Sequence, residues 1–215
     1  MASAGRERPG AEQPGTVRPG GRTARVRAAV LEAAGDLLAE GGLAALDLAE
    51  VARRADVGRT TVYRRWGSAV GLVTDLLADM AEQSLPRTET GSLLGDLTAN
   101  AELVRRTLTD PRQGPLFKAV IAAATSEAEA AEALHRFYAT RVEEWAPCVR
   151  QAAERGEVPA GTDPHEVIRA VSAPLYYRAL ASGDPLDEAA AGRAAAAATA
   201  AARAGVYVCG GRSGA

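Results

Sequence analysis

Two short helices separated by a tight turn constrain the fold of this chain more than any other sequence feature, and they lie within residues 46–66. The turn is at Asp56, where a left-handed backbone is tolerable for Asp, and Gly58 precedes the second helix. In that helix Val62 and Trp66 lie four residues apart and can face a core together. Two short helices joined by a turn of three or four residues predict a helix-turn-helix.

The second short helix carries polar and basic side chains that suit DNA. A helix fits the major groove, and its first turn directs side chains at base edges. The residues expected there are Arg59, Thr60, Thr61 and Arg64. Tyr63 is placed to reach a phosphate, and the helix starts at Asp47 and Ser68 offer backbone donors that also suit phosphates. An ordinary solvated face would also carry arginines, but the spacing of the whole unit favours DNA binding.

The remaining segments also predict helices, and no strand is expected. Apolar residues make up 47% of the chain and many are alanine, which favours helices over strands. Counting the two short helices, we expect an all-α fold of about nine helices. The other expected helices span about 23–41, 69–83, 92–109, a short segment around 116–121, 127–155, 163–181 and 184–204.

Several of these helices have recognisable starts or breaks. Thr23 can cap the first of them, and Asp163 and Asp184 each precede a proline at the first helical position. Pro147 removes one backbone donor from the long helix and should kink it. The domain organisation expected is a disordered arm at 1–22, a helix-turn-helix domain at 23–68, a helical domain at 69–206 and a flexible tail at 207–215.

Charge and composition exclude several classes of protein. Residues 1–67 carry 11 arginines against 8 acidic residues, a net of +3, whereas residues 81–215 carry 14 basic against 17 acidic, a net of −3. A basic first third fits an anionic partner. No run of about 18 apolar residues predicts a membrane span, and the N-terminus lacks the apolar core of a signal peptide, so the cytoplasm is the expected location.

No pattern points to catalysis or to a cofactor. The sequence has no glycine-rich phosphate loop, no supported Ser-His-Asp grouping and no His-Glu metal pair. Cys148 and Cys209 suit a reducing compartment and do not form a metal-ligand pattern. We therefore expect neither an enzyme nor a metal site.

The segment from about Arg25 to Met80 resembles the DNA-binding domain of the tetracycline-repressor-like (TetR/AcrR) regulators. The stretch "LDLAEVARRADVGRTTVYRRWGSA" matches that family's pattern in kind and spacing. The matching residues are Leu46, Ala52, Ala55, Val57, Thr61, Tyr63 and Trp66. Asp47 replaces the family's frequent Thr, and Asp56 and Gly58 replace its usual Gly and Ser.

Ala69 replaces a frequent family lysine that contacts phosphate. Losing that charge should flatten the salt dependence of DNA binding by about one unit. Arginines near the start of the chain could compensate, namely Arg18, Arg22, Arg25 and Arg27.

The resemblance implies a ligand-responsive transcription regulator, usually a repressor, that binds a near-palindromic operator in double-stranded DNA. It also implies a homodimer formed by the last two long helices and a cavity for a small-molecule effector. The residues that could line this cavity, or simply pack a core, are Phe117, Tyr138, Arg141, Trp145 and Tyr176. A half-buried Arg141 needs a partner, either Glu144 or an acidic ligand.

An alternative function stays open from the sequence. The chain could be a helical module that binds a small molecule or a protein, with a DNA-binding head that has decayed. The missing lysine at Ala69 is the best support for this alternative.

Overall fold

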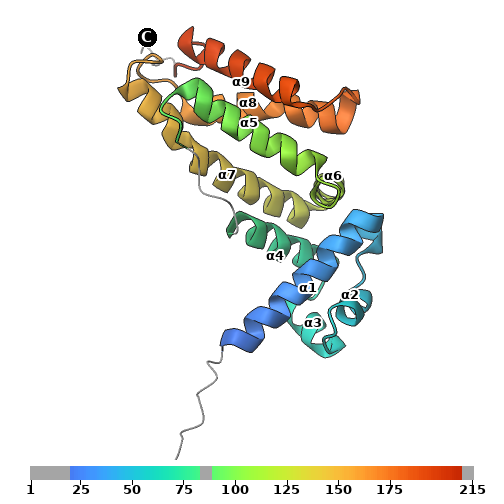
Figure 1. Ribbon diagram of the computed structural model, residues 1–215. Helices are drawn as coiled ribbons and strands as arrows, with labels where there is room; N and C mark the ends of the chain where they lie inside the picture. The colour runs from blue at the N-terminus through green and yellow to red at the C-terminus, as the bar shows by residue number, and fades with distance from the viewer. Residues whose placement is uncertain (1–19, 83–88, 210–215) are drawn as a thin grey trace, which may run out of the picture.

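The computed structural model describes residues 20–82 and 89–209, and within these residues the chain forms nine α-helices and no strand (Figure 1). The all-α prediction is therefore confirmed. The helices are α1 Gly20–Gly41, α2 Leu48–Arg54, α3 Arg59–Trp66, α4 Ala69–Glu82, α5 Leu93–Thr109, α6 Gln113–Ala124, α7 Ala128–Glu154, α8 Pro164–Tyr177 and α9 Glu188–Arg203. In the described part of the chain, no helix combines the length and apolar character needed to cross a membrane.

Local signals define the turn between α2 and α3 as expected. The Asp47 carboxylate caps α2 by accepting hydrogen bonds from the backbone of Ala49 and Glu50, both at 2.9 Å. Asp56 has a φ of 52°, which makes it the one described residue other than glycine with a left-handed backbone. Ser68 Oγ accepts a hydrogen bond from Gly71 N at 3.0 Å and so caps α4. These caps separate α2, α3 and α4 at the predicted positions.

Two apolar cores hold the helices together. The first joins α1–α4 to α6 and to the first half of α7, and it includes Val62, Trp66, Phe117 and Phe137. The second joins α5, the second half of α7, α8 and α9, and it includes Trp145. Figure 1 shows α5, α8 and α9 side by side, α7 along them, and α4 between α7 and α1. The helix-turn-helix therefore shares its core with α6 and the first half of α7.

The start of α1 differs from the prediction. The helix begins at Gly20, so Thr23 lies inside it and does not cap it. Arg22 consequently belongs to a helix and not to a disordered arm. Residues 1–19 of the predicted arm lie outside the described residues. Helix α7 runs through Pro147 to Glu154, and the kink expected there stays a prediction.

The start of α9 and the C-terminal tail also differ from the prediction. Asp187, not Asp184, caps α9 by accepting a hydrogen bond from Ala190 N at 2.8 Å. The expected flexible tail is wrong for residues 207–209. Tyr207 O accepts a hydrogen bond from Asp163 N at 2.7 Å, and Val208 pairs with Thr162 in an isolated antiparallel bridge. This pairing fixes the chain beside the start of α8. Residues 210–215 lie outside the described part.

Candidate DNA-binding helix and ligand cavity

Helix α3 has one buried side and one exposed side. Val62 is fully buried and Trp66 nearly so, and both belong to the first core. The predicted DNA-contacting residues lie on the remaining surface: Arg59, Thr60, Tyr63 and Arg64 are exposed and Thr61 is half-buried. The Tyr63 side chain, 49% exposed, is one of the largest apolar groups left in solvent. The helix thus presents a basic and polar face that the protein itself does not cover.

The arginines of α2 and α3 differ in whether they have carboxylate partners. Arg53 and Arg54 both bind Glu50, and their hydrogen bonds lower the pKa of that carboxyl to about 2. Arg54 also binds Glu40. In contrast, neither Arg59 nor Arg64 forms an ion pair with any described residue. The positive charge of α3 is therefore available to an external anion, whereas that of α2 is neutralised internally.

A polar network fixes α3 against α4 and α1. Trp66 Nε1 donates a hydrogen bond to Asp75 Oδ2 at 2.8 Å, and Arg27 Nη2 donates to Asp75 Oδ1 at 2.7 Å. Arg27 also pairs with Asp79. Arg65 lies over the Trp66 ring, with its guanidinium 5.0 Å from the ring centroid. The role of Asp75 could not be predicted from local sequence, because its partner Arg27 lies 48 residues away.

This network corrects the expectation that Arg27 could compensate for the missing lysine. Its guanidinium is held by two carboxylates of α4 and is not available to DNA. Arg22 and Arg25 are exposed on the first turns of α1, although Arg25 Nε donates to Gly21 O at 3.2 Å. Figure 1 places these turns at the same end of the molecule as α3. Arg18 lies outside the described residues.

The helix starts at Asp47 and Ser68 use some of the backbone donors that were expected to face phosphates. The donors of Ala49, Glu50 and Gly71 are bonded to the two capping side chains. A phosphate contact at either start therefore depends on the donors that remain.

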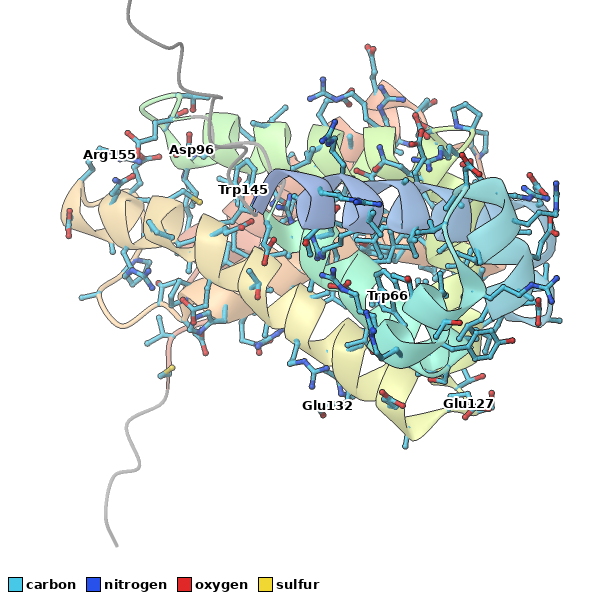
Figure 2. All side chains as sticks on the ribbon, turned by 90° about the horizontal axis from the view of Figure 1, so that it is seen from below. Trp66, Asp96, Glu127, Glu132, Trp145 and Arg155 are labelled. Atoms are coloured by element: carbon cyan, nitrogen blue, oxygen red, sulfur yellow. The ribbon has the colours of Figure 1, made fainter. Side chains whose placement is uncertain are left out.

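A cavity of about 1020 Å³ lies between the two cores. Its walls come from α1, α4, α5, α6, α7 and α8. The structure brings all five predicted ligand residues to this one cavity: Phe117, Tyr138, Arg141, Trp145 and Tyr176. Figure 2 shows that Trp145 lies well away from Trp66, in the other part of the molecule. The cavity thus belongs to the helical domain, to which α4 contributes, but also borders α1 of the DNA-binding domain.

The cavity wall includes a row of aromatic rings that sequence reasoning identified only in part. Phe117 and Phe137 have centroids 5.5 Å apart, Phe137 and Tyr138 5.4 Å, and Tyr138 and Tyr176 5.5 Å. The last two pairs meet edge to face, a favourable geometry for aromatic rings. Phe137 was missed, although its position next to Tyr138 on one helix was a usable signal.

Arg141 has the internal partner that the sequence left open. Its Nη1 donates a hydrogen bond to Glu144 Oε2 at 2.8 Å, one turn further along α7. The guanidinium therefore needs no acidic ligand to balance its charge.

A helix-turn-helix with an uncovered basic helix, joined to a helical domain with a cavity, defines a ligand-responsive DNA-binding regulator. Comparison with known proteins gives the family. Residues 30–76 match the family described as "Bacterial regulatory proteins, tetR family". Residues 87–198 match the one described as "Tetracyclin repressor-like, C-terminal domain". The chain belongs to the TetR family of transcription regulators.

Individual relatives agree with this assignment. The chain is 30% identical to the uncharacterized HTH-type transcriptional regulator YdeS of Bacillus subtilis over 161 residues, covering 74% of this chain and 81% of YdeS. It is 31% identical to the HTH-type transcriptional regulator AqdR of Rhodococcus erythropolis over 150 residues, covering 68% and 70%. The crystal structure of the TetR family transcription regulator SCO0332 superposes with a TM-score of 0.67 at 29% identity, covering 82% and 97%. The match over residues 30–76 includes α3, which argues against a decayed DNA-binding head.

Proposed function

We propose that the protein binds a near-palindromic operator as a homodimer and represses transcription, with α3 of each subunit in a major groove. The observation that carries this proposal is the division of α3 into a buried apolar side and an exposed side, whose Arg59 and Arg64 form no ion pair with a described residue. Arg59 and Arg64 would contact base edges, with Thr60 and Thr61 beside them. Two such helices read half-sites about 34–36 Å apart, or slightly more.

Phosphate contacts would position α3, the reading helix, in the groove. Tyr63 is exposed with a rigid phenol that suits this role. Arg22 and Arg25 offer positive charge at the same end of the molecule, and the starts of α2 and α4, near Asp47 and Ser68, offer backbone donors. These contacts give affinity without sequence preference.

The exposed faces of α8 and α9 support dimerisation through these two helices. Tyr177 at the end of α8 is 64% exposed, and Leu180 just beyond it is 43% exposed. Small exposed residues continue this surface: Ala173 and Pro174 on α8, and Ala189, Ala196, Ala197 and Ala200 on α9. An uncovered apolar surface of this kind is typical of an interface, and alanines let two helices approach closely.

A small molecule in the cavity would regulate DNA binding through α4. This helix packs on α1 and α7, contacts α3, and contributes Leu76, Asp79 and Met80 to the cavity wall. The ligand must prefer a conformation in which the two reading helices no longer match the groove spacing.

The first experiment is a binding titration with the DNA that flanks the protein's own gene, over a salt series. Arg59→Ala should weaken binding by about 1–3 kcal/mol and relax sequence preference, and Tyr63→Ala should weaken binding to all sequences. Arg53→Ala is the matched control, because this exposed arginine of α2 already pairs with Glu50. Weak, sequence-blind binding that is indifferent to the Arg59 and Tyr63 changes contradicts the proposal.

A second experiment tests the dimer. Light scattering after gel filtration should give the mass of two chains for the wild type. Ala197→Arg on the exposed face of α9 should give one chain, whereas Ala122→Arg, at an exposed position of α6, should leave the dimer intact. Two chains for both variants would rule out this face of α9.

A further inference from the structure

The arginines around the cavity already have carboxylate partners among the described residues. Its wall includes four arginines, and each forms an ion pair with a carboxylate of the protein: Arg106 with Glu102, Arg112 with Asp36, Arg141 with Glu144 and Arg169 with Glu166. The one remaining basic wall residue, His135, is exposed at the rim. A ligand carboxylate or phosphate placed inside would lose its hydration without gaining an unpaired cation, which is costly.

One buried polar atom at the cavity lacks a partner. The Tyr138 hydroxyl is buried and makes no hydrogen bond with any described residue. The Tyr176 hydroxyl is its polar neighbour, and the interaction between the two hydroxyls adds to the raised pKa of Tyr138, but the pair falls outside the distance and angle of a regular hydrogen bond. Burial raises the pKa of both phenols above the ordinary value of 10.0, so both remain neutral donors at physiological pH. A buried polar atom without a partner costs free energy that a ligand can recover by supplying one.

A second neutral polar group lies on the wall of the same cavity. Asn100 on α5 and Ser172 on α8 both line it, and Ser172 Oγ donates a hydrogen bond to Asn100 Oδ1 at 3.4 Å. The wall formed by the described residues therefore combines aromatic rings with amide and hydroxyl groups, and each of its arginines has a carboxylate partner.

We propose that the effector is an uncharged, predominantly aromatic molecule with one hydroxyl or carbonyl group, which bonds to the Tyr138 hydroxyl while its ring lies among Phe117, Trp145 and Tyr176. This inference rests on the proposed function in one respect, because it takes the cavity as the site where the effector binds. Arg141 forms part of the wall through its ion pair with Glu144 and does not bind an anionic group of the ligand.

The test uses three probes that share one ring system: naphthalene, 2-naphthol and 2-naphthoate. Equilibrium dialysis against the full-length protein at pH 7.5 gives a dissociation constant for each. One neutral hydrogen bond should make 2-naphthol bind about 3- to 10-fold more tightly than naphthalene. 2-Naphthoate should bind at least about 10-fold more weakly than 2-naphthol, because its carboxylate finds no unpaired cation.

Two variants separate the roles of single groups. Tyr138→Phe should lower the affinity for 2-naphthol to that for naphthalene and leave naphthalene unchanged, whereas Tyr207→Phe, outside the cavity, should change neither. Glu144→Gln leaves Arg141 without that carboxylate and should raise the affinity for 2-naphthoate alone. The proposal is wrong if 2-naphthoate binds most tightly to the wild type, if Tyr138→Phe weakens naphthalene as much as 2-naphthol, or if no probe binds.

We would also measure operator binding by the same samples without any probe. This measurement distinguishes a failure of the proposed ligand class from a failure of the proposed regulatory function. Intact operator binding without a preference for 2-naphthol refutes the ligand class alone. A preserved preference for 2-naphthol without operator binding refutes the proposed regulation and leaves the cavity chemistry in place.

Discussion

Removing the Asp75 carboxylate should loosen the reading helix from the rest of the protein. Asp75 on α4 accepts hydrogen bonds from Trp66 Nε1 on α3 and from Arg27 on α1. The side chains of Arg27 and Asp75 are 21% and 27% exposed, so solvent screens their interaction only in part. Asp75→Ala would leave the indole N–H without its acceptor and Arg27 with Asp79 as its remaining carboxylate partner within this network.

The expected cost follows from these contacts. A hydrogen bond to a charged group contributes about 1.5–3 kcal/mol to stability. Because the ion pair of Arg27 with Asp75 is partly exposed, breaking it should cost less than breaking a fully buried ion pair. We expect Asp75→Ala to lower the free energy of unfolding by about 2–3 kcal/mol, or Tm by roughly 4–12 °C for a chain of this size. Trp66→Phe removes one bond to Asp75 and should cost less, about 1–2 kcal/mol.

Thermal unfolding followed by circular dichroism measures the loss, and a salt titration with operator DNA measures its effect on function. Both variants should weaken operator binding more than binding to unrelated DNA, because a misplaced α3 loses base contacts before phosphate contacts. Glu82→Ala, an exposed acidic residue on the same helix, is the control. Unchanged Tm and unchanged operator preference in Asp75→Ala would refute the view that this network positions α3.

The same carboxyl makes part of the stability dependent on pH. Desolvation acts to raise the pKa of Asp75, but the hydrogen bonds from Arg27 and Trp66 outweigh it and hold the pKa below its ordinary value of 3.8. A depressed folded-state pKa stabilises the protein fully above the unfolded-state pKa, and this contribution is lost as the pH falls through the folded-state pKa. The stability difference between wild type and Asp75→Asn should therefore shrink below about pH 4.

Three further changes test other parts of the structure. Ala69→Lys should strengthen DNA binding and steepen its salt dependence by about one unit, measured as the slope of log K against log salt. Gly71→Ala should destabilise by about 1–3 kcal/mol in thermal unfolding, because the new methyl would lie 2.2 Å from Trp66 O, whereas Gly21→Ala, with nothing within 4 Å, should not. Ending the chain at Val206 should lower the free energy of unfolding by about 1–3 kcal/mol, because two backbone hydrogen bonds to residues 161 and 163 are lost; an unchanged Tm would show that the tail contributes nothing.

The helix-turn-helix could be predicted because its determinants are local. A cap at Asp47, a left-handed turn at Asp56 and a second cap at Ser68 each act within three or four residues. The start of α9 was misplaced because the segment offers two aspartates three residues apart. Asp184 is held by the Ser182 hydroxyl, to which it is bonded twice, and so belongs to the turn after α8. Asp187 is left to cap the helix.

Contacts between distant residues account for what the sequence did not predict. The tail at 207–209 has no local pattern of its own, and its order comes from residues 161–163. Asp75 resembles any surface acid of an amphipathic helix until Arg27 and Trp66 are placed beside it. Most of the aromatic cavity residues could be predicted from helical spacing. One of the ion pairs of the cavity wall, Arg112 with Asp36, instead joins two residues 76 positions apart in the chain.

Asp79 shows why the cavity and the reading helix are not independent. It lines the cavity and also pairs with Arg27, which binds the same Asp75 that accepts the hydrogen bond from Trp66. A ligand in the cavity therefore lies against one end of a continuous polar chain whose other end is on α3. Contiguity alone does not move the helix, since a ligand shifts a conformational equilibrium only by its difference in affinity for the two states. A double-mutant cycle between Asp79→Asn and Trp66→Phe measures this link. If both residues belong to one network, their effects on the free energy of operator binding should be coupled by at least about 0.5 kcal/mol. Strictly additive effects would mean that the cavity acts on α3 through the apolar packing of α4 instead.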